Sequence, residues 1–60
     1  MVDMKFFDYT HLPPNLQEVS KEVQRLAVFM KNTLPEGREK SAGMRKLLEA
    51  KDCFVRAMLE

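Results

Sequence analysis

The chain has little of what small proteins use to hold themselves together. Its 60 residues include a single cysteine, Cys53, and a single histidine. No disulfide can therefore form within the chain, and no cluster of Cys and His suggests a zinc site. A domain of this size buries only about 60% of the surface of its unfolded chain. The missing stability must come from further copies of the chain or from a partner.

Other absences disfavour whole classes of function. The net charge is +1, whereas a general nucleic-acid-binding protein carries a large basic excess. No apolar run approaches the roughly 18 residues of a membrane span, and no signal peptide is visible. A free cysteine without an export signal indicates the reducing cytoplasm. We therefore expect no contact with duplex nucleic acid or with membranes.

The residues needed for catalysis are also scarce. Glu18 and Glu22 are four residues apart, but Lys21 and Arg25 sit beside them, which is typical of a solvated charged face. Cys53 has no base at a readable spacing, and no glycine-rich phosphate loop is present. We expect a protein that is not an enzyme and that needs no cofactor and no metal.

What the chain does have is two helical patterns. Pro13-Pro14 ends an N-terminal segment and suits the first position of a helix, while Asn15 and Glu18 offer a capping box. Apolar residues then recur at spacings of three and four, in the order Leu16, Val19, Val23, Leu26, Met30 and Leu34. The sequence predicts an all-α fold: an arm over 1–13 and an antiparallel helical hairpin over 14–60. Its helices cover about 14–33 and 38–59, with a loop over 34–37.

The two helices carry more apolar surface than one hairpin can bury. Val28 and Phe29 lie off the seam of the first helix, on a second face. On the second helix, small residues recur every seven positions at Gly43, Ala50 and Ala57. Cys53 is expected to be a small buried residue on this helix. These extra faces predict a symmetric oligomer.

The arm is rich in rings, with Phe6, Phe7, Tyr9 and His11 close together. The two phenylalanines are expected to pack on the helices or on a neighbouring subunit. Tyr9 and His11 each combine a flat ring with a polar tip, on which a nucleobase can stack.

The segment from Leu34 to Ser41 is the most informative part of the chain. It places Arg38, Lys40 and Ser41, with Arg45 one turn later, beside the expected start of the second helix. Unpaired N–H groups and the helix dipole favour an anion there, and Arg can donate two hydrogen bonds to a phosphate. A charged surface turn would have the same composition. In a symmetric oligomer several such clusters converge, which favours a compact ligand with two or three phosphates.

The same segment carries a resemblance to a known family. Leu34-Pro35-x-x-Arg38-Glu39-Lys40-Ser41, followed by Lys46-Leu47, Glu49-Ala50 and Arg56-Ala57, resembles the phage anti-CBASS protein 2 family, which is grouped with a Thoeris-inhibiting sponge. The likeness covers about residues 24–57. Proteins of this family are hexamers that sequester cyclic di- and trinucleotide messengers of bacterial immune systems without cleaving them.

The resemblance implies roles for particular residues. The loop residues Arg38, Glu39, Lys40 and Ser41 would line a pocket for cyclic trinucleotides. Tyr9 would stack on a base of a cyclic dinucleotide in a separate pocket. Arg25, with Lys21 behind it, would meet the phosphate of that ligand. The protein would then be a homohexamer in the cytoplasm of an infected bacterial host.

A second reading of the sequence involves no nucleotide. A helical hairpin with apolar residues on several faces can also be a small interaction module. It would dock on a partner protein through Val28, Phe29 and the small-residue face of the second helix. This reading explains the extra apolar faces but not the cluster from Arg38 to Ser41.

Overall fold

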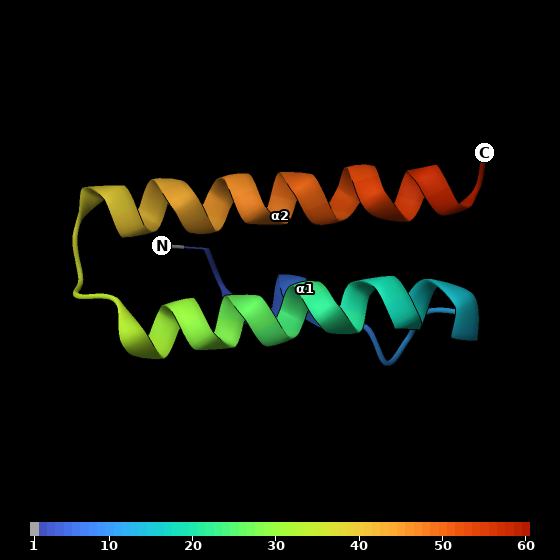
Figure 1. The fold of residues 1–60 in the computed structure, drawn as a ribbon, viewed down its shortest axis with the longest axis horizontal. Coiled ribbons are helices and arrows are strands. Elements are labelled where there is room, and N and C mark those ends of the chain that lie inside the picture. Colours follow the sequence, from blue (N-terminus) through green and yellow to red (C-terminus); the bar gives the residue numbers. More distant parts are fainter. Residues whose placement is uncertain (1) are drawn as a thin grey trace.

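The computed structural model describes residues 2–60 as two long helices and one short helical turn. The 3-10 turn η1 spans Met4–Phe7, helix α1 spans Pro14–Thr33 and helix α2 spans Arg38–Met58. The helices run antiparallel, side by side, and a short loop joins them (Figure 1). Neither helix carries an apolar stretch long enough to cross a bilayer. The predicted all-helical, hairpin-like fold is confirmed for the described residues.

Helix α1 begins without a side-chain cap. Pro14 takes the first helical position, where its missing N–H costs nothing, and Pro13 precedes it in an extended conformation. The capping box offered by Asn15 and Glu18 is not formed. Instead, the side-chain amide of Gln17 donates through Nε2 to the carbonyl of Leu12 at 2.7 Å. That hydrogen bond ties the start of the helix to the preceding arm.

The loop between the helices follows from its proline and glycine. Leu34 leaves the helix in an extended conformation, as expected for a residue that precedes a proline. Gly37 precedes α2, and no side chain caps its N-terminus. Glu39 in the first turn and Arg56 in the last turn both complement the helix dipole. The helix ends at Met58, and Leu59 follows as its C-cap.

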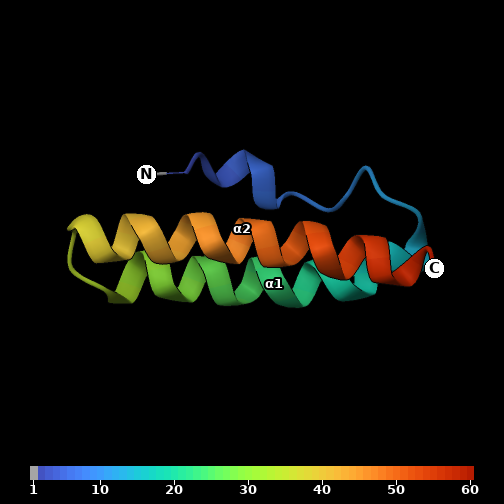
Figure 2. The same cartoon turned by 90° about the horizontal axis from the view of Figure 1, so that it is seen from above.

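The N-terminal arm, residues 2–13, lies along one side of the helix pair (Figure 2). Phe7 is completely buried in a cluster with Val23, Ala27 and Met44. Lys51 of α2 is also buried, and its ammonium donates to the carbonyls of Phe6 at 2.7 Å and Asp8 at 3.1 Å. The arm is thus a third packing element, held by the ring of Phe7 with Val2 and Met4 packed beside it, and by hydrogen bonds from Lys51 and Gln17.

The arm changes which stripe of α1 is buried. The sequence pattern placed Leu26 and Leu34 on the apolar seam, but both are exposed. The buried residues are Leu16, Ser20, Val23 and Ala27. Ser20 and Ala27 lie on the flank beside the predicted seam, and Ala27 belongs to the same buried cluster as Phe7 of the arm.

The prediction that Cys53 is buried is wrong, because its side chain is exposed. The apolar side chains of Phe54, Met58 and Leu59 near the end of the chain are exposed as well. The buried residues of α2 are Met44 and two lysines, Lys40 and Lys51. Long lysine stems pack on apolar neighbours while their ammonium groups find backbone carbonyls, and hydrophobic periodicity does not detect that arrangement.

Candidate anion-binding loop

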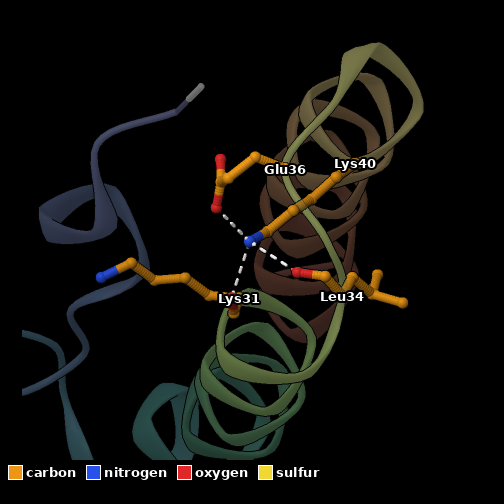
Figure 3. Close-up of polar contacts among 4 residues, drawn as sticks. All are labelled: Lys31, Leu34, Glu36 and Lys40. Carbon is orange, nitrogen blue, oxygen red and sulfur yellow. Dashed lines mark hydrogen bonds and ion pairs between the residues drawn. The ribbon is translucent and has the colours of Figure 1, made fainter.

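Lys40 fixes the shape of the loop that joins the two helices. Its ammonium donates to the carbonyl of Lys31 at 2.7 Å, the carbonyl of Leu34 at 3.1 Å and the Glu36 carboxylate at 2.6 Å (Figure 3). An ammonium has three hydrogens, so all of its donors have a partner. Only 3% of the side chain is exposed. Lys40 therefore acts as a C-terminal cap for α1 and holds the loop closed against it.

Glu36 completes this arrangement from the solvent side. Its side chain is largely exposed, and the hydrogen bond from Lys40 lowers the pKa of the Glu36 carboxyl below its ordinary value. The carboxylate therefore stays ionised as the solution becomes mildly acidic. A charged partner for a buried ammonium removes much of the cost of burying it.

An open hollow of about 590 Å³ lies against the loop at the N-terminus of α2. It is lined by the loop and the first turn of that helix, namely Leu34, Pro35, Glu36, Gly37, Arg38, Glu39 and Lys40. The first intrahelical hydrogen bond of α2 runs from the N–H of Ser41 to the carbonyl of Gly37. The N–H groups before it have no partner within the helix, and the helix dipole adds positive potential there. An anion placed in this hollow meets both.

The structure divides the predicted loop residues into two groups. Arg38, Ser41 and Arg45 are spaced i, i+3 and i+7 on α2, which places them on one stripe of the helix surface. Arg38 and Arg45 are exposed, and Ser41 is half-buried. Lys40 lies on the side that faces α1. The stripe, rather than Lys40, therefore presents cationic and hydroxyl donors to solvent. Glu39 is exposed beside it.

The residues predicted for a second pocket lie apart from this loop. Tyr9 is half-buried in the arm, and Lys21 is exposed on α1. The guanidinium of Arg25 lies 3.0 Å from the Glu22 carboxylate, and both side chains are exposed. Within residues 2–60, no hydrogen bond or ion pair joins Tyr9 to either basic residue. A single chain thus brings the loop residues together but does not unite Tyr9, Lys21 and Arg25.

Comparisons with protein-family models, with curated proteins and with solved structures each found no match to this chain. The resemblance described above therefore depends on the loop motif and the short segments of α2 that follow it.

Sequence reasoning missed the structural role of both buried lysines. For Lys40 a signal was present: Glu36 stands four residues earlier, and the last carbonyls of α1 need donors. For Lys51 no local signal exists, because its acceptors lie in the arm, far away in the sequence. Only the folded chain brings those groups together.

Proposed function

We propose that this protein is a sponge that binds cyclic di- or trinucleotide second messengers of bacterial anti-phage signalling without cleaving them. The observation that carries the proposal is the loop over 34–37 together with the first two turns of α2, which include Arg38 and Arg45. It combines a helix N-terminus without a side-chain cap, two exposed arginines on one stripe, and a backbone held in place by Lys40. The same residues carry the resemblance to the phage anti-CBASS protein 2 family.

The chemistry of the loop suits phosphate capture. Arg38 and Arg45 can each donate paired N–H groups to phosphate oxygens, and the hydroxyl of Ser41 can donate between them. Glu39 accepts hydrogen bonds, so its partner on a nucleotide is an amino or hydroxyl group rather than a phosphate. Lys40 holds the loop and the phosphate donors beside it in place before the ligand binds. Less conformational entropy is therefore lost on binding.

A sponge needs binding and no turnover. Its activity requires donors for phosphate, surfaces on which bases stack, and a pocket that excludes water. In the proposed assembly, a symmetric oligomer brings several loops around one axis, and a hexamer is the form that the resemblance implies. A second ligand site, with Tyr9 stacking on a base and Arg25 and Lys21 meeting a phosphate, would form between subunits.

The proposal is tested by titration calorimetry with a panel of cyclic di- and trinucleotides. The complex is then heated to denature the protein, and the released ligand is identified by chromatography. We expect tight binding of at least one ligand and its recovery intact. The stoichiometry per chain identifies the pocket in use. Absence of heat with every member of the panel would refute the sponge, and recovery of a linear product would show an enzyme.

The loop assignment is tested by Arg38→Ala, with Lys46→Ala as the matched control. Both changes remove one exposed positive charge from α2, but Lys46 lies off the stripe of Arg38. Loss of a charge-assisted hydrogen bond costs about 1.5–3 kcal/mol, so the dissociation constant should rise roughly 10- to 100-fold for Arg38→Ala. The control should bind nearly as the wild type does. Equal weakening by both variants would mean that general charge, not the loop, attracts the ligand.

The alternative is a helical interaction module that docks on a partner protein and takes no nucleotide. The exposed apolar side chains of α1 and α2 favour it. It predicts that no nucleotide in the panel binds. The loop would then have a structural role only.

A further inference from the structure

Glu36 and Lys40 form an ion pair whose two members differ sharply in burial. The side chain of Lys40 is 3% exposed, whereas that of Glu36 is 79% exposed. Of the three hydrogen bonds that the ammonium donates, only the one to Glu36 goes to a charged group. Figure 3 draws the carboxylate on one side of the ammonium and the carbonyls of Lys31 and Leu34 on another. A buried positive charge is therefore balanced by a group that remains in solvent.

The two members of the pair also differ in how firmly they are held. Glu36 belongs to the loop and lies two residues before Arg38, where α2 begins. Releasing an exposed carboxylate into water costs little, because the group is already largely hydrated. Lys40 has no such freedom, since its stem is buried and two of its hydrogen bonds go to backbone carbonyls. When the pair separates, Glu36 leaves and a buried ammonium stays behind without a counter-charge, which is costly.

Glu36 and Lys40 both line the hollow at the start of α2 in which the proposed ligand binds. The charged residues of that lining are Arg38 and Lys40, which are positive, and Glu36 and Glu39, which are negative. Two positive and two negative charges cancel, so the lining of the free protein offers an anion little net attraction. When Glu36 turns outward, two positive charges face one negative charge. An anion and the Glu36 carboxylate therefore compete for the same place.

Replacing Glu36 by a phosphate group keeps both the charge and the hydrogen bonds balanced. A phosphodiester carries one negative charge, as a carboxylate does, and its oxygens accept hydrogen bonds from the same donors. We infer that Glu36 occupies a phosphate position in the free protein and that a bound phosphate group displaces it from the ammonium of Lys40. Lys40 keeps its hydrogen bonds to Lys31 and Leu34 and continues to close the loop. This inference rests on the proposed function and adds an internal competitor to it.

The competitor makes the site selective for anions that carry more than one phosphate. A single small anion gains a contact with Lys40 but replaces the one that Glu36 made, so its net gain is small. A second phosphate group also reaches the exposed stripe of Arg38 and Arg45. Within residues 2–60 neither arginine has an ion pair with a carboxylate, so contacts made there displace nothing. Binding is thus favoured only when both kinds of contact form together.

The first test uses inorganic pyrophosphate, a compact anion with two phosphates and no base. Glu36→Gln and Glu39→Gln each remove one negative charge from the hollow and keep the size of the side chain, but only Glu36 contacts Lys40. Calorimetry should show tighter binding by both variants. The dissociation constant should fall about fivefold further for Glu36→Gln, the factor that corresponds to an ion pair with an exposed member. Equal gains would show that general charge alone is responsible, and weaker binding by Glu36→Gln would show that Glu36 supports binding; either result overturns the inference.

The second test needs only the wild type, so it does not depend on how the variants fold. The ¹³C resonance of the Glu36 carboxyl and the ¹⁵N resonance of the Lys40 ammonium are followed by NMR during titration with pyrophosphate. They are followed separately with each cyclic nucleotide of the panel. Displacement should move the Glu36 signal to the position of a free carboxylate, while the Lys40 ammonium stays protected from exchange with water.

The two probes separate failure of this inference from failure of the sponge proposal. If pyrophosphate displaces Glu36 but no cyclic nucleotide binds, the sponge proposal is refuted and the competitor is supported. If a cyclic nucleotide binds and the Glu36 signal does not move at saturation, the sponge is supported and the competitor is refuted. If neither probe binds, the inference is overturned together with the anion site.

Discussion

The two buried lysines lie in two regions of the molecule that differ in how completely their buried polar groups are hydrogen-bonded. At the loop, Lys40 has three acceptors, and one of them is a carboxylate. Under the arm, Lys51 donates to two backbone carbonyls, and those acceptors carry no charge. Nearby on α1, the hydroxyl of Ser20 is completely buried and has no partner among the described residues.

This difference bears on function. The loop is a closed polar network, so its backbone is held in one arrangement and can present a preorganised set of donors. The arm has one fully buried ring, Phe7, and its hydrogen bonds to the helices join uncharged carbonyls to Lys51 and Gln17. Regions with fewer satisfied contacts open more readily than the rest of a fold. We expect the loop to be rigid and the arm to detach first when the protein is destabilised.

The largest expected effect comes from replacing each lysine by methionine, which keeps the length of the stem. Lys40→Met should lower the free energy of unfolding by about 3 kcal/mol, and Lys51→Met by about 2 kcal/mol, because hydrogen bonds from charged donors are lost. Urea denaturation followed by circular dichroism measures both values. Lys46→Met, at an exposed position of the same helix, should change stability by less than about 0.5 kcal/mol.

Hydrogen exchange separates the two lysine variants further. Lys51→Met should speed exchange in η1 and leave the helix pair protected, whereas Lys40→Met should affect the loop and the adjoining helix ends. If both variants lowered the free energy of unfolding equally and sped up exchange at the same amides, the contrast between the two regions would be wrong.

A smaller effect is expected at Ser20. Ser20→Ala removes a buried hydroxyl that has no hydrogen-bond partner and places a better helix former in α1. We expect a gain of about 1 kcal/mol in the free energy of unfolding. Ser20→Thr keeps the hydroxyl and adds a methyl group at a site with no exposed surface, so it should destabilise. Destabilisation by Ser20→Ala would show instead that the hydroxyl has a partner, such as a bound water.

The smallest effect concerns pH. The pKa values of Glu36 and Asp8 are both lowered, the first by the hydrogen bond from Lys40 and the second by hydrogen bonds from the backbone and side chain of Thr10. A lowered pKa means that the stabilisation is fully present above the ordinary carboxyl range, about pH 4, and is lost as pH falls through the lowered value. Unfolding temperatures should therefore be steady near neutrality and fall in acid.

Glu36→Gln isolates the contribution of the loop to this acid dependence. The variant should show a shallower fall in unfolding temperature below about pH 4, because one of the two shifted carboxyls is absent. Asp8→Asn should act in the same direction through the arm. A wild-type acid profile in both variants would mean that other carboxylates govern acid unfolding.

Much of the fold could be predicted from local patterns. Spacings of three and four indicated two helices, and Pro14 and Gly37 stand where the structure begins α1 and precedes α2. The grouping of Arg38, Ser41 and Arg45 could also be anticipated, because residues three and seven apart share a helix face. What the pattern could not show was which groups the ammonium of Lys40 would contact. The carbonyls of Lys31 and Leu34 draw Lys40 to the other side.

The remaining errors have one physical origin. The prediction from hydrophobic spacing requires each helix to bury its most apolar stripe against the other helix. That requirement is not met when a third element also packs on the helices. The arm inserts Phe7 beside Ala27, so the buried stripe of α1 is displaced and Leu26 is left outside. On α2, the burial predicted for Cys53 was also wrong. No local signal in residues 2–13 specified where the arm would dock.

The sequence by itself determined that this chain forms two antiparallel helices with a basic segment at the start of the second. Helix formation and termination depend on neighbours within a few positions, and those neighbours are visible in the sequence. Only the tertiary structure decided that Lys40 closes the loop, that Lys51 holds the arm, and that several apolar side chains of both helices stay exposed. Those outcomes depend on carbonyl groups and ring surfaces that become neighbours only after the chain has folded.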